Sequence, residues 1–193
     1  MTPSRASAAV CRWRRRLGTL YSVRSLASSE VFGPAMQALV QRVRRAAAYL
    51  VDEAHGPEAA GEPLGRIERG YVVLLGVRLG DTAEDADALA GRVAGLRVFP
   101  DDGGRMNLSV LDVGGKVLSI PQFTLYADTR RGRRPGFSDA APPEVAEPLY
   151  RRFNERLVSA GVPVETGRFR AHMVVEIHND GPVTVLLEAP VVP

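Results

Sequence analysis

Two stretches of the chain carry apolar residues at helical spacing. Residues 81–99 and 143–161 each place an apolar residue at every third or fourth position, which is typical of one buried helix face. In the first stretch, Thr82 followed by Asp85 forms a capping-box pattern, which indicates a helix start. The pattern therefore predicts two long amphipathic helices. Their apolar positions are Ala86, Leu89, Val93 and Leu96 in the first, and Ala146, Leu149, Tyr150, Phe153 and Leu157 in the second.

Most other apolar residues alternate with polar ones or form short continuous runs, which indicates strands. About seven strands joined mainly by hairpin-like connections predict an α+β fold, with a mainly antiparallel, barrel-like sheet and two long helices. The polar, glycine- and proline-containing residues 52–65 and the basic residues 129–143 are expected to be loops. The strands are predicted in residues 36–43, 46–51, 71–79, 106–113, 116–127, 172–177 and 183–188.

The last two strand-like runs are separated by Asn179-Asp180-Gly181-Pro182. Asp-Gly by itself suits a hairpin turn, whereas the added proline removes a backbone donor just before a strand. Two interpretations remain open at this point. The proline could simply prevent slippage of the strand register, or the Gly181–Pro182 backbone could itself be part of a functional site.

Charge is distributed unevenly along the 193 residues, a length that suits one domain of roughly 100–200 residues. The formal net charge is +3, but residues 1–35 contain six arginines and one acidic residue. Of the 25 basic and 22 acidic residues in the whole chain, 19 basic and 21 acidic residues therefore lie in residues 36–193, which gives that part a net charge of −2. The rest of the chain is therefore not generally basic, and any contact with RNA requires a local basic patch.

Residues 1–35 are rich in arginine and serine and nearly free of acidic residues. This composition fits a transit peptide, and it equally fits upstream sequence translated ahead of a true start at Met36. We expect a dispensable extension, followed by a single domain over residues 36–190. No apolar run approaches the ~18 residues that a membrane span needs, so no membrane partner is expected.

Few residues outside the extension are suited to metal or thiol chemistry. The only cysteine is Cys11, which leaves no thiol nucleophile or cysteine zinc site in residues 36–193. His55 falls in a predicted loop, and His172 and His178 share a predicted strand about 20 Å apart, too far for one metal to bridge. The sequence therefore predicts no metal site and no cofactor.

A proline interrupts the strand pattern in "SIPQFTLYAD", residues 119–128. In a strand, Gln122 and Thr124 would share one face, which places an amide beside a hydroxyl. Proline inside a strand indicates an edge or a bulge, and bulges often direct side chains into sites. This stretch is either a solvated edge strand or part of a catalytic site.

Four arginines surround a glycine in "TRRGRRPGF", residues 129–137. Guanidinium groups match phosphate oxygens, and a cluster of them attracts RNA in a salt-sensitive way. The loop is therefore either a solvated basic surface or an RNA-binding element, and the resemblance described below makes the RNA a tRNA. Its arginines are Arg130, Arg131, Arg133 and Arg134.

Taken together and in order, these fragments resemble the D-aminoacyl-tRNA deacylase family, also called the D-tyrosyl-tRNA deacylase family. The resemblance extends from Met36 to about Glu188. A single fragment is weak support, but the ordered set is highly specific. The fragments are "QRV", "LLGV", "LRVF", "MNLSV", "QFTLYAD", "GRRPGFSDAAPPE", "ETGRF", "MVV" and "NDGPVT".

The resemblance implies a cytoplasmic homodimer that hydrolyses the ester between a D-amino acid and the 3′-terminal ribose of tRNA, for chiral proofreading in translation and without a cofactor. Each subunit is expected to insert a cis Gly181–Pro182 element into its neighbour's active site. Arg42 and Asn179 are expected to support this element. Because the backbone would exclude L side chains, glycyl-tRNA should also be a substrate.

The resemblance also implies roles for the strand-like stretch. Gln122, Phe123 and Thr124 are expected to be catalytic, with backbone amides near Phe123 and Thr124 stabilising an oxyanion and water acting as the nucleophile. Phe123 and Phe137 are expected to be walls for the terminal adenine. Pro121 and Met173 are expected to line the same pocket.

Three positions depart from the family pattern: Pro121 replaces a serine, Gly136 replaces a serine and Arg170 replaces a glycine. The animal branch that tolerates L-alanine also has Pro-Gln at the position of Pro121. The sequence "NDGPVT" and Arg42 instead favour D-specificity. The alternatives are a relaxed-chirality deacylase acting on L-alanyl-tRNA and a non-catalytic tRNA-binding homologue.

Overall fold

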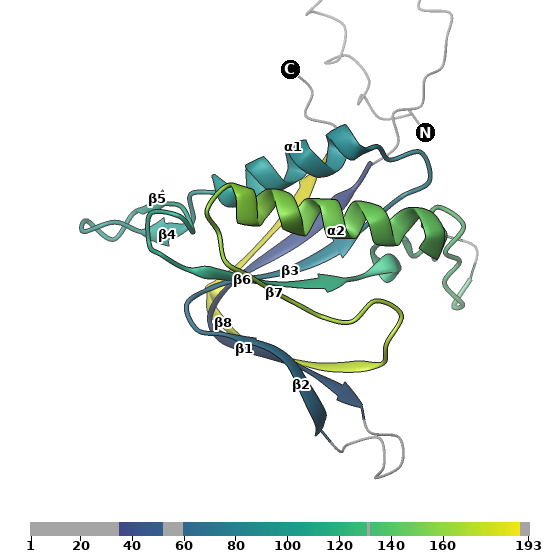
Figure 1. The fold of residues 1–193 in the computed structure, drawn as a ribbon, viewed down its shortest axis with the longest axis horizontal. Coiled ribbons are helices and arrows are strands. Elements are labelled where there is room, and N and C mark those ends of the chain that lie inside the picture. Colours follow the sequence, from purple (N-terminus) through teal and green to yellow (C-terminus); the bar gives the residue numbers. More distant parts are fainter. Residues whose placement is uncertain (1–34, 52–59, 131, 190–193) are drawn as a thin grey trace, which may run out of the picture. The chain divides into compact units, whose positions relative to one another are not determined.

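The sheet is built around one long strand, β1 (Gln37–Val51), in the computed structural model of the protein (Figure 1). The first half of β1 pairs antiparallel with β3 (Gly70–Gly76), and its second half pairs antiparallel with β2 (Ala60–Ile67). Along its other edge, β1 pairs antiparallel with β8 (Met173–Glu188). This one strand therefore joins the two halves of the sheet.

The structure describes residues 35–51, 60–130 and 132–189, all within one compact unit, Phe32–Pro193. Part of the sequence-based prediction falls outside these residues. It comprises residues 1–34 of the expected extension, His55 and Arg131.

Two parallel strands complete the main sheet. β6 (Lys116–Pro121) pairs with β3, and β7 (Val164–Thr166) pairs with β6. β7 then approaches β2 so closely that a Cβ atom added at Gly65 would lie 2.9 Å from the Cβ atom of Glu165. The sheet therefore curls into a nearly closed, barrel-like form, and a side chain at position 65 would obstruct the approach.

Helices α1 (Ala83–Ala94) and α2 (Pro143–Ser159) lie side by side over the sheet (Figure 1). The predicted capping box is present, because the Thr82 hydroxyl accepts from the Asp85 amide at 3.3 Å and the Asp85 carboxylate accepts from the Thr82 amide at 2.9 Å. The apolar positions predicted for the two helices are buried or half-buried and both helices are present, but α1 ends at Ala94, so the stretch predicted over residues 81–99 is too long and Leu96 lies after the helix.

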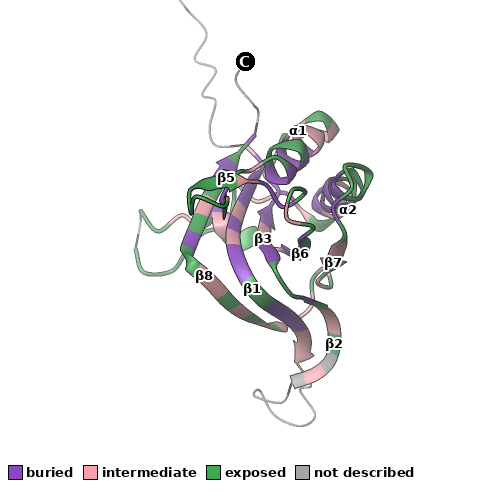
Figure 2. Cartoon of the chain, turned by 90° about the vertical axis from the view of Figure 1, so that its left-hand side faces the viewer, coloured by how far each residue is buried: buried purple, intermediate pink, exposed green. Residues whose placement is uncertain are grey.

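The core has two parts. One lies between the helices and the sheet, where Leu89, Phe153 and Leu157 pack with Tyr71 and Phe99. The other lies inside the curled half of the sheet and consists of Val43, Ala46, Ala48, Ile67, Val72, Leu118 and Ile120. Because β1 contributes residues to both parts of the core, it is largely buried. Figure 2 shows this, and it shows that β8 instead alternates mostly between half-buried and exposed residues.

Several predicted strand boundaries are wrong. Residues 46–51 continue β1 rather than forming a separate strand, and β2 begins at Ala60, inside the predicted loop. Of the predicted strand 106–113, only β5 (Met106–Leu108) is extended, and it pairs with β4 (Phe99–Pro100) in a small separate sheet. The turn that follows is fixed locally, because the Asp112 carboxylate accepts hydrogen bonds from the Ser109 amide and hydroxyl.

The fold class is confirmed, with one refinement to the sheet. The pairs that include β1 are antiparallel, whereas β3, β6 and β7 run parallel to one another, so the sheet is mixed. Parallel neighbours require a crossover, and α1 and α2 lie on the two crossovers. Hairpin-like connections therefore do not dominate as the sequence pattern suggested.

Candidate active site

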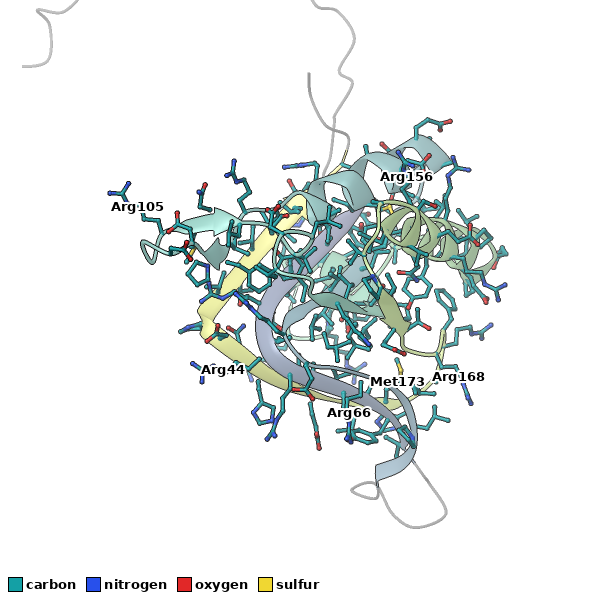
Figure 3. All side chains as sticks on the ribbon, turned by 60° about the vertical axis from the view of Figure 1, so that its left-hand side comes forward. Arg44, Arg66, Arg105, Arg156, Arg168 and Met173 are labelled. Atoms are coloured by element: carbon teal, nitrogen blue, oxygen red, sulfur yellow. The ribbon has the colours of Figure 1, made fainter. Side chains whose placement is uncertain are left out.

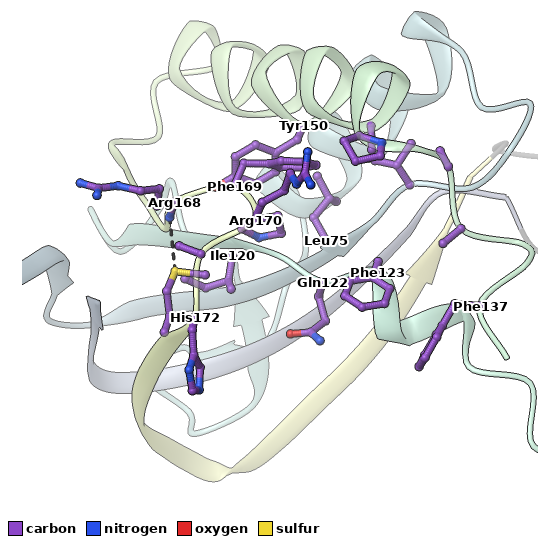
Figure 4. Close-up of a pocket in the computed structure, with 18 of the residues that line it drawn as sticks. Leu75, Ile120, Gln122, Phe123, Phe137, Tyr150, Arg168, Phe169, Arg170 and His172 are labelled. Atoms are coloured by element: carbon purple, nitrogen blue, oxygen red, sulfur yellow. Dashed lines mark hydrogen bonds between the residues drawn. The ribbon is translucent and has the colours of Figure 1, made fainter. Parts of the chain in front are cut away.

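An apolar pocket of about 570 Å³ opens beside the ends of β3 and β6 (Figure 4). Its polar lining residues are Gln122, Arg168, Arg170 and His172, and no acidic side chain lines it. The remaining lining is apolar or aromatic. It comprises Leu75, Val77, Ile120, Pro121, Phe123, Phe137, Ala140, Ala141, Pro143, Ala146, Tyr150, Phe169, Ala171, Met173 and Val175.

The stretch after Pro121 turns away from the sheet as a short 3-10 helix, η1 (Phe123–Tyr126), which corrects the predicted strand. The Gln122 amide still donates to the Leu75 carbonyl at 2.8 Å, so the hydrogen bonding of the strand ends one residue past Pro121. Gln122 and Thr124 nevertheless meet, because the Gln122 side-chain amide donates to the Thr124 hydroxyl. The first amides of a helix lack intrahelical acceptors, which leaves donors at the edge of the pocket.

Aromatic rings form the pocket walls. Phe123 and Phe137 meet edge to face, with ring centroids 5.0 Å apart, and 57% of the Phe123 side chain is exposed. On the α2 side, the Tyr150 and Phe169 centroids are 6.2 Å apart. The Tyr150 hydroxyl donates to the Ser119 carbonyl at 2.8 Å, and burial raises the pKa of this phenol. The walls therefore suit a planar apolar group.

The segment predicted to be a hairpin turn is instead a bulge within the single strand β8. Val43 of β1 pairs with Asn179 and Gln41 pairs with Thr184, so the intervening residues of β8 bulge out opposite Arg42. Asn179 closes the bulge, since its side-chain oxygen accepts from the Val183 amide at 2.8 Å and its nitrogen donates to the Thr184 hydroxyl at 3.2 Å. The strand therefore resumes the same direction along β1.

At the tip of the bulge, the Gly181–Pro182 peptide bond is cis and Gly181 has φ +135°. Both residues are exposed. Arg42, only 9% exposed, donates from Nε to the Asp180 carbonyl at 3.0 Å and from Nη1 to the Val98 carbonyl at 2.5 Å. One buried guanidinium thus ties the bulge to the segment that follows α1.

The arginine loop closes through two hydrogen bonds between the Asp128 and Gly136 backbones, at 2.8 and 2.9 Å. Arg130 binds the Asp128 carboxylate through two nitrogens, both at 2.8 Å, and these bonds lower the pKa of Asp128 to about 2. Arg133 and Arg134 are exposed, and neither forms an ion pair with a described carboxylate. Among the described arginines of this loop, Arg133 and Arg134 are therefore the two that remain available to a ligand.

The structure brings together five predicted residues in the pocket: Pro121, Gln122, Phe123, Phe137 and Met173. Thr124 lies beside them through its bond to Gln122. The bulge residues Asp180 to Pro182 and the described arginines of the basic loop, Arg130, Arg133 and Arg134, do not line this pocket in the same chain.

Sequence reasoning missed the roles of Tyr150 and Phe169 as pocket walls. The apolar spacing places Tyr150 only on the buried face of its helix, and its hydroxyl group on that face is the available signal. His172, predicted to lie in a strand, precedes β8 and lies at the pocket (Figure 4), whereas His178 is an exposed residue of β8. The two histidines therefore have different surroundings.

Within the described ranges, no group of three or more His, Cys, Asp or Glu side chains is placed to hold a metal ion. Nor does this part of the chain contain a helix long and apolar enough to cross a membrane.

Comparison with solved structures defines the class of protein. The "c-Myc DNA Unwinding Element Binding Protein" superposes with a TM-score of 0.71 at 39% identity, over 80% of this chain and 99% of that one. A "probable eukaryotic D-amino acid tRNA deacylase" superposes with a TM-score of 0.65 over the same shares, and at 17% identity this likeness concerns the fold alone. The fold is therefore shared with both of these proteins.

Sequence comparison then gives the family. A family model described as D-Tyr-tRNA(Tyr) deacylase matches residues 39–188. The D-aminoacyl-tRNA deacylase of Symbiobacterium thermophilum is 56% identical over 154 residues, which is 80% of this chain and 96% of that protein. The chain belongs to the D-aminoacyl-tRNA deacylase family of enzymes, as the sequence motifs predict.

Proposed function

We propose that the protein hydrolyses the ester that joins a D-amino acid to the 3′-terminal ribose of tRNA, releasing free tRNA and the D-amino acid. One observation carries the proposal. The chain combines an apolar, aromatic-walled pocket edged by Gln122 with a braced bulge that exposes the Gly181 and Pro182 backbone. Family membership supports the same reaction, which would act in the cytoplasm as chiral proofreading.

In this proposal the pocket positions the ester and water attacks its carbonyl carbon. The bond from that carbon to the ribose oxygen then breaks, and the ribose oxygen takes up the proton that the attacking water releases. The amides of Phe123 and Thr124, at the start of η1, stabilise the negative charge that develops on the carbonyl oxygen. Among the described residues no base accepts a hydrogen bond from the Thr124 hydroxyl, which itself accepts from the Gln122 side-chain amide, so Thr124 acts as a support rather than as the nucleophile.

Selection of the D enantiomer would come from the bulge of a second subunit. Gly181 and Pro182 are exposed and lie outside the pocket of their own chain. In a homodimer each bulge would reach the neighbouring pocket, where backbone carbonyls hold the substrate α-amino group and leave no room for an L side chain. Glycine has no side chain, so glycyl-tRNA would also be hydrolysed.

A relaxed-chirality enzyme is the second candidate, and one observation favours it. Pro121 lies at the pocket beside Gln122, where it could change the space available to a small L side chain. A non-catalytic tRNA-binding protein is the third candidate.

The experiment is deacylation of tRNA charged with D-tyrosine, L-tyrosine, D-alanine, L-alanine or glycine by the purified full-length chain. Hydrolysis of the D and glycyl esters alone would support the proposal. Hydrolysis of L-alanyl-tRNA at a comparable rate would establish the relaxed enzyme, and binding of tRNA without hydrolysis of any ester would leave only the tRNA-binding protein.

Binding of tRNA should depend on Arg133 and Arg134. The double variant Arg133→Ala, Arg134→Ala should weaken tRNA binding and reduce the slope of log K against log salt by about 1 for each phosphate that the protein no longer neutralises. Titrations at several salt concentrations measure this slope. A matched control is Arg105→Ala, Arg156→Ala, which removes the same charge from exposed positions elsewhere (Figure 3). Equal slopes for the two double variants would mean that the loop is only a solvated surface.

A chain that begins at Met36 should fold and deacylate as the full chain does. Met36 is fully buried and its backbone nitrogen donates to Asp81 at 2.9 Å, so the described fold needs the chain from this residue onward. Thermal unfolding and deacylation of the truncated chain test the expectation. Loss of soluble protein on truncation would show that residues 1–35 are required.

A further inference from the structure

Arg170 has an unusual backbone conformation for a long charged residue. Its φ is +59°, and it is the only non-glycine residue with positive φ in the part of the chain that the structure describes. Such conformations are unfavourable for residues with a Cβ atom and are concentrated at functional sites. A glycine would adopt this turn without strain, so the arginine requires an explanation.

The turn that contains Arg170 is anchored to the pocket floor. The Ala171 amide donates to the Arg168 carbonyl at 3.3 Å, and the Arg168 amide contacts the Met173 sulfur at 3.3 Å. Gly167 packs so tightly that an added Cβ atom would lie 2.9 Å from Ile120 and 3.0 Å from Met173. The turn therefore holds Arg168 and Arg170 at a fixed place on the pocket wall (Figure 4).

Both guanidinium groups are available to a ligand. Arg168 and Arg170 are exposed, no acidic residue lines the pocket, and neither arginine forms an ion pair among the described residues. Two arginines of α2 are paired instead, Arg151 with Glu147 at 2.6 Å and Arg152 with Asp87 at 2.7 Å. Two unneutralised cations at the mouth of an apolar pocket suit a ligand with a planar apolar part and an anionic part.

We propose that Arg168 and Arg170 form a phosphate subsite that binds the phosphodiester 5′ to the terminal adenosine of the substrate. The inference rests on the proposed function, since it assumes that the adenine lies between the aromatic walls while the ester lies at Gln122. The two arginines flank Phe169 at the pocket, where guanidinium forks can take phosphate oxygens. This subsite is separate from Arg133 and Arg134, which do not line the pocket.

The experiment measures direct binding by calorimetry, so its outcome does not depend on deacylation. The probes are AMP, adenosine and inorganic phosphate, and the proteins are the wild type, Arg168→Ala, Arg170→Gly and Arg170→Lys. Glycine tolerates the positive φ, so Arg170→Gly removes the guanidinium without distorting the turn. Arg105→Ala, in the β4–β5 loop far from Arg168 (Figure 3), is the control for loss of one positive charge.

The wild type should bind AMP about tenfold more tightly than adenosine. A factor of this size is what one charge-assisted hydrogen bond to the phosphate contributes to affinity. Arg168→Ala and Arg170→Gly should each reduce the preference for AMP severalfold, while the affinity for adenosine stays the same. Arg170→Lys should keep part of the preference for AMP, and the control Arg105→Ala should keep all of it. Weak binding of inorganic phosphate would show that the base is needed as well.

Two results would overturn the subsite: a wild type that does not prefer AMP to adenosine, or a preference that survives both arginine variants. Either result could coexist with normal deacylation of D-aminoacyl-tRNA. Conversely, an arginine-dependent preference for AMP in a protein that hydrolyses no ester would refute the proposed reaction while preserving the subsite. The two proposals therefore fail separately.

Discussion

Replacing Arg42 with alanine should lower the free energy of unfolding by about 2–4 kcal/mol and slow deacylation of D-tyrosyl-tRNA by roughly 10–100-fold. The Arg42 side chain is 10% exposed and donates to the carbonyls of Asp180 and Val98. Its loss leaves two carbonyl groups without their donor and a cavity under the bulge. The bulge would then lose its fixed position. Denaturant unfolding and steady-state kinetics measure the two effects.

Arg44 offers a matched control, because it pairs with the carboxylate of Asp180, which Arg42 Nε also approaches at 3.4 Å. Its Nε atom lies 3.1 Å from Asp180 Oδ1, but its side chain is 82% exposed. An exposed ion pair contributes at most about 1 kcal/mol, so Arg44→Ala should change stability and activity little. The losses of stability and activity in Arg42→Lys should lie between those of Arg42→Ala and Arg44→Ala, since one ammonium group does not reproduce the guanidinium fork. Similar losses in Arg42→Ala and Arg44→Ala would mean that net charge, rather than the buried bonds, supports the bulge.

Replacing Gly181 with alanine should be the most damaging single change in the bulge. At φ +135° a side chain is strained, which costs about 1–3 kcal/mol. The new Cβ atom would also lie 2.7 Å from Val183 Cγ2 and 3.0 Å from the Val183 nitrogen. Val183 is 8% exposed and cannot move freely, so overpacking adds roughly 1–3 kcal/mol. The displaced backbone should abolish most deacylation of D-tyrosyl-tRNA.

Comparison with Gly132→Ala separates the effect of backbone strain on stability from the effect of crowding by neighbouring atoms. Its φ is +138°, close to that of Gly181, but an added Cβ atom would meet no atom within 4 Å. Gly132→Ala should therefore share the strain without the crowding. A chain of this length loses about 2–4 °C in melting temperature for each kcal/mol, so the two variants should differ by several degrees. Equal melting temperatures would show that the space around Gly181 is not restrictive.

The sequence by itself determined the elements whose signals are local. The helices follow from apolar residues at every third or fourth position and from a cap, Thr82 with Asp85, whose partners are three residues apart. The pairing of Gln122 with Thr124 was also predicted, although on a strand. Their contact survives in η1 because residues two apart remain neighbours in either conformation.

Only the tertiary structure decided how the strands pair. An alternating pattern indicates which face of a strand is buried, but not which strand lies beside it. The runs on either side of Gly181 and Pro182 look like the two arms of a hairpin. In the fold both pair with β1, because the fifteen residues of that strand offer an edge to each of them. The same long strand spans both halves of the sheet, which the sequence pattern divided into two strands.

The pocket is likewise a product of the tertiary structure. It gathers the end of β6, the loop with Phe137, the first turns of α2 and the turn with Arg170. These segments are far apart in sequence, so no local pattern relates Phe123 to Phe169. The sequence revealed that Arg170 departs from the family pattern. Its positive φ and its place on the pocket wall arise because packing of Gly167 against Ile120 and Met173 fixes the turn.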